Sequence, residues 1–151
     1  MTYREHASAR PTSGFTLIEL LVAVAIIGLL AAIAIVAFAA ALDRAKQRAT
    51  MADMRTLARA LEAYDVDHGR FPDDSGGVTA LEPLLIPYQV NVVPTHDSWG
   101  WPYSYDAVQN SYTLESFGKD GVDGTDLSKA TRDIFEHDIV LADGRFVASP
   151  E

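Results

Sequence analysis

The feature that most constrains this chain is an apolar run from Gly14 to Leu42, GFTLIELLVAVAIIGLLAAIAIVAFAAAL. No charged residue occurs between Leu20 and Leu42, and a helix of about 20 apolar residues is long enough to cross a bilayer. Glu19 is the exception, because a carboxylate in lipid is costly unless it is paired or protonated. The run therefore predicts a membrane-crossing helix whose one acid needs a partner.

The helical pattern continues beyond the apolar run. From about Asp43 to Asp67 there is no proline, and Met54, Leu57, Leu61 and Tyr64 recur at helical spacing among charged residues. Gly69 and the following Phe71-Pro72 provide a stop signal. We therefore predict one long helix, with an apolar half in the membrane and an amphipathic half packed on a globular domain.

Length and composition limit the rest of the chain. The 151 residues divide into a polar leader (1–14), an apolar helix (15–42) and a small domain (43–151). The net charge of −9 disfavours a nucleic-acid partner, which would require a basic face. The absence of cysteine excludes disulfides and thiol nucleophiles.

The second half of the chain has the pattern of a small sheet. A short helix is expected over Val78–Ile86, and strands over Trp101–Tyr105 and Ser111–Ser116, separated by the turn DAVQN. A last hairpin follows, DIVL and RFV around an Asp-Gly turn. Four aromatic residues alternate as in a strand and are expected to pack on the helix: Trp99, Trp101, Tyr103 and Tyr105. The fold class is α+β.

No catalytic arrangement stands out, and we predict that the protein is not an enzyme. The four histidines are scattered without metal-ligand spacing, and there is no phosphate-binding glycine loop. The Gly- and Asp-rich segment GKDGVDGTDLSKATRD has two interpretations. Its oxygen donors suit Ca²⁺, although its spacing does not fit an EF-hand; alternatively, it is a solvated turn.

Several motifs together resemble one family. SGFTLIELL at Ser13–Leu21 resembles the processing signal of type IV pilins and type II secretion pseudopilins. YDVDHGRFP at Tyr64–Pro72, DSWGWPY at Asp97–Tyr103 and the stretch Tyr112–Gly121 are similar to segments of the major pseudopilin. The resemblance covers almost the whole chain and implies a pilin-like lollipop, in which a long N-terminal helix packs on a small antiparallel sheet.

The resemblance also implies roles for residues near the apolar run. A prepilin peptidase would cleave after Gly14 and methylate the amine of Phe15, and Glu19 would pair with the N-terminal amine of a neighbouring subunit. The alternative for Glu19 is a position among lipid headgroups, where the helix dipole tolerates an acid. The mature chain would lie in the bacterial inner membrane as a single-pass protein, with its C-terminal domain in the periplasm. Charge alone weakly favours the opposite orientation, because Arg44, Lys46 and Arg48 follow the run.

The implied function is that of a structural subunit in a homo-oligomeric, pseudopilus-type filament that drives type II protein secretion. Its partners would be other pseudopilins, the prepilin peptidase and the inner-membrane assembly platform. Two alternatives stay open: a type IV pilus subunit for adhesion, motility or DNA uptake, and a membrane-anchored sensor or enzyme. The chain departs from many relatives in lacking a proline in the middle of the apolar helix and in having a longer final hairpin.

A calcium site is likewise implied by the resemblance. It would use the carbonyl of Phe117 together with Asp120 and Asp138. The loop is longer here than in the family pattern, so more than one acid can match a family ligand. Further candidate ligands are therefore Asp123, Asp126, Asp133 and Glu136.

Overall fold

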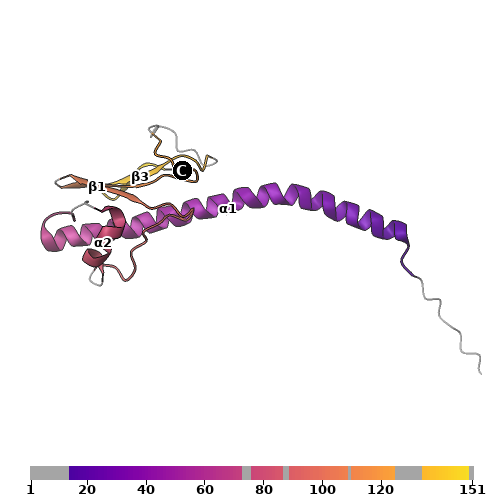
Figure 1. Cartoon of the computed structure of the whole chain (residues 1–151), viewed down its shortest axis with the longest axis horizontal. Coiled ribbons are helices and arrows are strands. Elements are labelled where there is room, and N and C mark those ends of the chain that lie inside the picture. Colours follow the sequence, from indigo (N-terminus) through magenta and orange to yellow (C-terminus); the bar gives the residue numbers. More distant parts are fainter. Residues whose placement is uncertain (1–13, 73–75, 87–88, 109, 125–133, 150–151) are drawn as a thin grey trace, which may run out of the picture. The chain divides into compact units, whose positions relative to one another are not determined.

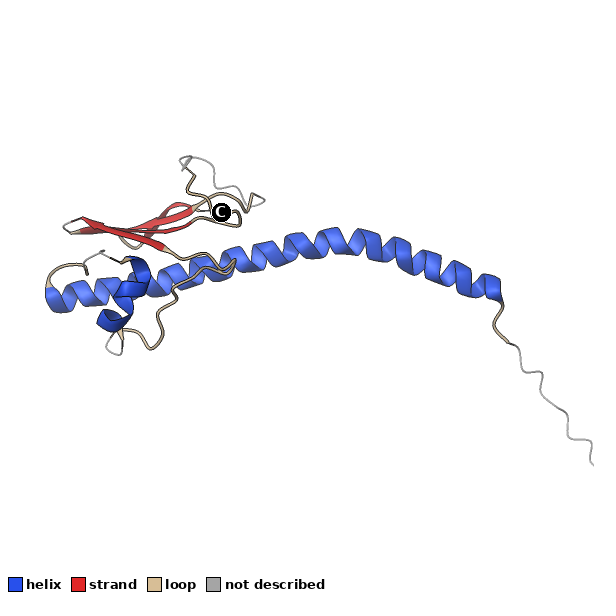
Figure 2. Cartoon of the chain, in the orientation of Figure 1, coloured by secondary structure: helices blue, strands red, loops and turns tan. Residues whose placement is uncertain are grey.

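A computed structural model describes residues 14–72, 76–86, 89–108, 110–124 and 134–149. Two helices are followed by four strands (Figures 1 and 2): α1 (Leu17–His68), α2 (Gly77–Leu85), β1 (Ser104–Val108), β2 (Ser111–Ser116), β3 (Ile139–Ala142) and β4 (Arg145–Ala148). The chain divides into two compact units between Phe38 and Ala39, within α1. The α+β class and the single long helix are both confirmed.

The first unit contains the apolar part of α1. All its described residues are exposed, and its large apolar side chains from Phe15 to Phe38 are between 53 and 83% exposed. Among the described residues, α1 is the one helix long and apolar enough to cross a membrane. A helix that is apolar on every face requires lipid or other helices around it.

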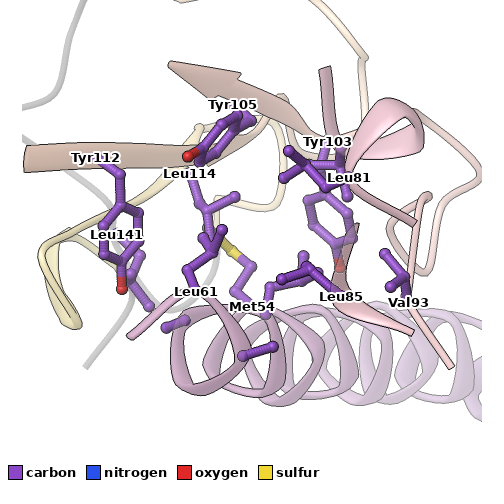
Figure 3. Close-up of a cluster of buried hydrophobic side chains, with 14 of the residues drawn as sticks. Met54, Leu61, Leu81, Leu85, Val93, Tyr103, Tyr105, Tyr112, Leu114 and Leu141 are labelled. Atoms are coloured by element: carbon purple, nitrogen blue, oxygen red, sulfur yellow. The ribbon is translucent and has the colours of Figure 1, made fainter. Parts of the chain in front are cut away.

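The second unit has a core formed by the rest of α1, α2 and the sheet. Met54, Leu57, Leu61 and Tyr64 of α1 are all buried, as their spacing predicts. Figure 2 shows the sheet lying against this part of α1. Figure 3 shows the main apolar side chains that fill the space between these elements: Met54, Leu61, Leu81, Leu85, Val93, Tyr103, Tyr105, Tyr112, Leu114 and Leu141.

The helix ends as predicted. The Nδ1 of His68 lies 3.0 Å from the carbonyl oxygen of Tyr64. Since a carbonyl oxygen only accepts, the N–H at Nδ1 donates this hydrogen bond to the last turn of the helix. Gly69 then has a positive φ of 70°, which suits glycine because it has no Cβ. These two residues stop the helix and direct the chain towards the sheet.

The sheet has four antiparallel strands in the order β1-β2-β3-β4. β2 has the predicted bounds, and β3 and β4 form the predicted hairpin around Asp143 and Gly144, both with positive φ. Asp143 also accepts hydrogen bonds from the hydroxyl of Ser111 (3.0 Å) and the backbone N–H of Tyr112 (2.9 Å). The hairpin turn is thus tied to the start of β2.

The prediction for β1 is wrong in its bounds. The strand begins at Ser104 rather than at Trp101, and it continues to Val108 through most of the predicted DAVQN turn. Tyr103 and Tyr105 are buried as expected, but Trp101 is 42% exposed and so does not pack into the core. The reason for the shift is a turn around Asp97 that holds the preceding residues.

Asp97 is a buried carboxylate that organises this turn. Its Oδ1 accepts hydrogen bonds from three backbone N–H groups, those of Trp99 (3.0 Å), Gly100 (2.9 Å) and Trp101 (2.9 Å). Its Oδ2 accepts one from the hydroxyl of Ser116 in β2 (2.7 Å). Since three consecutive backbone donors point at one carboxylate oxygen, these residues cannot form a strand ladder.

Candidate functional site

The first candidate site is the start of α1. Gly14, Phe15 and Thr16 precede the helix, which begins at Leu17. Phe15 is 81% exposed, and a Cβ added at Gly14 would meet no atom within 4 Å. The bond between Gly14 and Phe15 therefore lies in non-helical, accessible chain. A peptidase needs such a bond, although the cleavage itself stays a prediction.

Thr16 and Glu19 form a capping box at this helix end. The backbone N–H of Thr16 donates to Glu19 Oε2 (3.0 Å), and the backbone N–H of Glu19 lies 3.3 Å from Thr16 Oγ1. The hydroxyl of Thr16 also donates to Glu19 Oε2 (2.8 Å). Such a reciprocal pair satisfies two N–H groups that the first turn leaves free. The T-x-x-E spacing is the local sequence signature of this arrangement, which is absent from the predictions above.

The side chain of Glu19 lies on an apolar helix face. A shallow groove runs along this face, lined by Phe15, Ile18, Glu19, Val22, Ala23 and Ile26. Glu19 is the acid of the first turn, where the helix dipole favours negative charge. This face thus presents one carboxylate at the end of a long apolar surface.

The second candidate site lies in the loop between β2 and β3. One carboxylate oxygen from each of Glu115, Asp123 and Asp138 lies within 4.8 Å of the others. The structure thus brings together two predicted ligands, Asp123 and Asp138, and adds Glu115. The sequence around Glu115 does not predict its place in this cluster, because strand pairing and loop closure bring the three carboxylates together.

The other predicted ligands have different outcomes. Asp120 lines a cleft of about 160 Å³ together with Asp138 and Glu136. Phe117 is half-buried at the start of the loop, and the role of its carbonyl stays a prediction. Asp126 and Asp133 lie outside the described residues.

Hydrogen bonds to backbone N–H groups connect the two described ends of the loop. The N–H of Lys119 donates to the carbonyl of Phe135 (2.8 Å), and the N–H of Gly124 donates to Asp138 Oδ2 (2.7 Å). Gly118 has a φ of 63°, and a Cβ there would lie 2.7 Å from the carbonyl oxygen of His137. Only glycine therefore allows the two sides of the loop to approach so closely.

The electrostatics of this cluster favour a cation. Burial raises the pKa of Glu115, and the nearby carboxylates of Asp138 and Asp123 raise it further. Burial also raises the pKa of Asp138, against the lowering effect of the Gly124 N–H. Asp138 is only 7% exposed, and its Oδ1 has no hydrogen-bond partner among the described residues. An all-oxygen donor set with an unpartnered buried carboxylate oxygen fits a hard divalent cation such as Ca²⁺.

Comparison with known proteins decides the family. Residues 37–136 match the family model described as type II secretion system (T2SS), protein G. The chain belongs to this family. Residues 10–41 also match the prokaryotic N-terminal methylation motif, which spans Gly14, Phe15 and Glu19.

Curated relatives agree with the family assignment. The chain is 35% identical over 127 residues to the type II secretion system core protein G of Pseudomonas aeruginosa, a match that covers 76% of this chain and 89% of the relative. It is 32% identical to the Aeromonas hydrophila protein of that name, over 78% and 90% of the two chains. No solved structure gives a significant match.

Family membership confirms the resemblance to the major pseudopilin and the expected function, a structural subunit of the type II secretion pseudopilus. The family is one of structural proteins, which agrees with a non-enzymatic role. Together with the apolar N-terminal helix, it indicates an inner-membrane anchor with a periplasmic domain.

Proposed function

We propose that this chain drives secretion mechanically, by leaving the membrane and joining a growing pseudopilus through its apolar helix. The observation that carries the proposal is the all-round exposure of the apolar side chains between Phe15 and Phe38. Within the described residues this surface has no partner in its own chain. It can exchange lipid for the equivalent helices of other subunits, because both surroundings are apolar.

In this proposal the prepilin peptidase removes residues 1–14 and methylates the amine of Phe15. The mature chain spans the inner membrane once, with its second unit in the periplasm. In the membrane it meets the assembly platform and other pseudopilins. Glu19 then pairs with the N-terminal amine of a neighbouring subunit. The capping box supports this role, because it holds the carboxylate at the first turn, close to where such an amine would arrive.

Replacement of Glu19 tests the assembly step. We expect Glu19→Ala to be processed normally, since the Gly14–Phe15 bond is unchanged, and to lose filament assembly. The measurements are mass spectrometry of the N-terminus and electron microscopy of sheared filaments. Glu82→Ala is the matched control, because Glu82 is an exposed acid on α2. Normal filaments from Glu19→Ala would disprove the proposed pairing.

We further propose that the periplasmic unit binds Ca²⁺ at the loop between β2 and β3. The ligands would come from the carbonyl of Phe117 and the side chains of Asp120, Asp123 and Asp138, with Asp126 a candidate outside the described residues. The support is the oxygen-only cluster and the unpartnered Oδ1 of Asp138. The ion would neutralise carboxylates that otherwise repel one another.

Chelation tests the calcium proposal. In the full-length protein in detergent micelles, EDTA is expected to lower the melting temperature of the second unit, and added Ca²⁺ to restore it. The transition can be followed by tryptophan fluorescence, since Trp99 and Trp101 both lie in this unit. An Asp120→Asn variant should respond less to both reagents. An unchanged melting temperature on chelation would count against the site.

A further inference from the structure

Glu115 occupies a fixed position near the C-terminal end of β2, an inner strand of the sheet. Its strand, β2, pairs with β1 on one side and with β3 on the other, and Glu115 lies opposite Ser104 and Val140. Along β2 the residues Tyr112, Leu114 and Ser116 are buried, whereas Glu115 between them is only half-buried. Because neighbouring strand residues point to opposite faces, Glu115 projects from the face of the sheet away from the core.

Two acids approach Glu115 on this outer face. Asp138 directly precedes β3, and Asp123 comes from the loop, so the three carboxylates originate from separate segments. Three negative charges within 4.8 Å of one another destabilise a fold unless protons or a cation compensate them.

A second observation points to a ligand at this place. Asp138 is more than nine-tenths buried, and among the described residues its Oδ1 accepts no hydrogen bond. Its other oxygen, Oδ2, accepts the N–H of Gly124 and is therefore held in position. A buried carboxylate oxygen without a partner is expensive, so this atom is available to a cation rather than to the protein.

We infer that Glu115 is a ligand of the cation at this site, together with Asp123 and Asp138. The inference rests on the proposed calcium function and deepens it, because the ligand comes from the sheet and not from the loop. An ion held in this way connects the C-terminal end of β2 to the loop and to the residue just before β3. It acts as a cross-link of the sheet, and its removal should loosen β2 and β3 as well as the loop.

The probe for this inference is Tb³⁺, which takes the same oxygen ligands as Ca²⁺ and emits when a nearby tryptophan is excited. Trp101 is suitable as the donor, because its ring packs directly against Gly121, two residues before Asp123. The full-length protein in detergent micelles is first stripped with EDTA and then titrated with Tb³⁺, and the bound Tb³⁺ is displaced with Ca²⁺. Glu115→Gln is compared with the wild type and with Glu82→Gln, an exposed control on α2.

We expect Glu115→Gln to weaken Ca²⁺ binding by at least about tenfold, with Glu82→Gln unchanged. Wild-type affinity in Glu115→Gln would overturn the inference while leaving the calcium site intact. Absence of Tb³⁺ and Ca²⁺ binding by the wild type would overturn both the calcium site and the role of Glu115.

Thermal stability provides a second readout that separates a ligand from a structural residue. In EDTA, Glu115→Gln should melt at a higher temperature than the wild type, because one of three repelling charges is removed. In saturating Ca²⁺ the order should reverse, because the variant loses a ligand. A variant that is less stable than the wild type to the same extent under both conditions would contradict the inference.

Discussion

The two parts of α1 have different surfaces although they belong to one helix. Up to Phe38 every face is apolar and exposed, whereas from Asp43 onwards a single stripe is buried and the other faces are polar. The second part satisfies its apolar stripe within its own chain, so it needs no partner. The first part cannot do so, which leaves lipid or other subunits as its surroundings. The comparison shows that the arrangement of apolar residues, not their number, determines where a helix finds its partner.

The largest expected effect comes from replacing a leucine by alanine in the second part of α1, compared with the same change in the first part. Leu61 is fully buried in the core of the second unit, whereas Leu29 is 65% exposed. Leu61→Ala should lower the free energy of unfolding by about 2–5 kcal/mol, because it removes buried methyl groups and leaves a cavity. Leu29→Ala, the matched control on the same helix, should leave it unchanged. Urea titration of the full-length protein in micelles, followed by tryptophan fluorescence, provides the measurement.

The reverse pattern should hold for filament assembly. Leu29→Ala, although it does not affect folding, removes apolar surface that we propose to pack against other subunits. Filament yield should therefore fall for a variant whose second unit is as stable as the wild type. If Leu29→Ala instead destabilised the second unit as much as Leu61→Ala does, the proposed division of labour along α1 would be wrong.

The next effect concerns how the sheet is held on the second part of α1. Asp97 positions the turn in which the N–H of Ser98 donates to Thr50 Oγ1 on α1 (3.1 Å). Asp97→Ala would leave several buried or half-buried donors without an acceptor, at a cost of about 1–3 kcal/mol or more. The same urea titration measures it, and Asp97→Asn should restore part of the loss by keeping one acceptor oxygen. An alanine variant as stable as the wild type would mean that water replaces the carboxylate.

The segments of the chain differ in how far the sequence predicts their structure. Long, periodic segments were predicted well: the α1 stripe, β2 and the final hairpin all agree with the structure, because local pattern determines them. The start of β1 was missed because the Asp97 turn depends on a hydrogen bond to Ser116, nineteen residues away. Glu115 was missed for the same reason, since only strand pairing and loop closure bring it to Asp123 and Asp138. Thr16 could have been found, since the capping-box spacing is local.

The smallest expected effect concerns an ion pair at the start of the second part of α1. Asp43, its first residue, accepts a hydrogen bond from the Lys119 ammonium (2.8 Å), which ties the loop between β2 and β3 to the helix. This contact lowers the pKa of Asp43. Because the folded state holds the ionised form, the stabilisation is present at neutral pH and is lost as the pH falls through the folded-state pKa of Asp43.

Half of the Lys119 side chain is exposed, so solvent screens the pair and Lys119→Met should cost only about 0.2–1 kcal/mol at pH 7. The difference from the wild type should vanish once the pH is below the folded-state pKa of Asp43, and it should shrink in high salt. In a double-mutant cycle with Asp43→Asn the two losses should be non-additive. Strictly additive losses would show that Lys119 stabilises the loop without the helix, and the start of the second part of α1 would then depend on apolar packing alone.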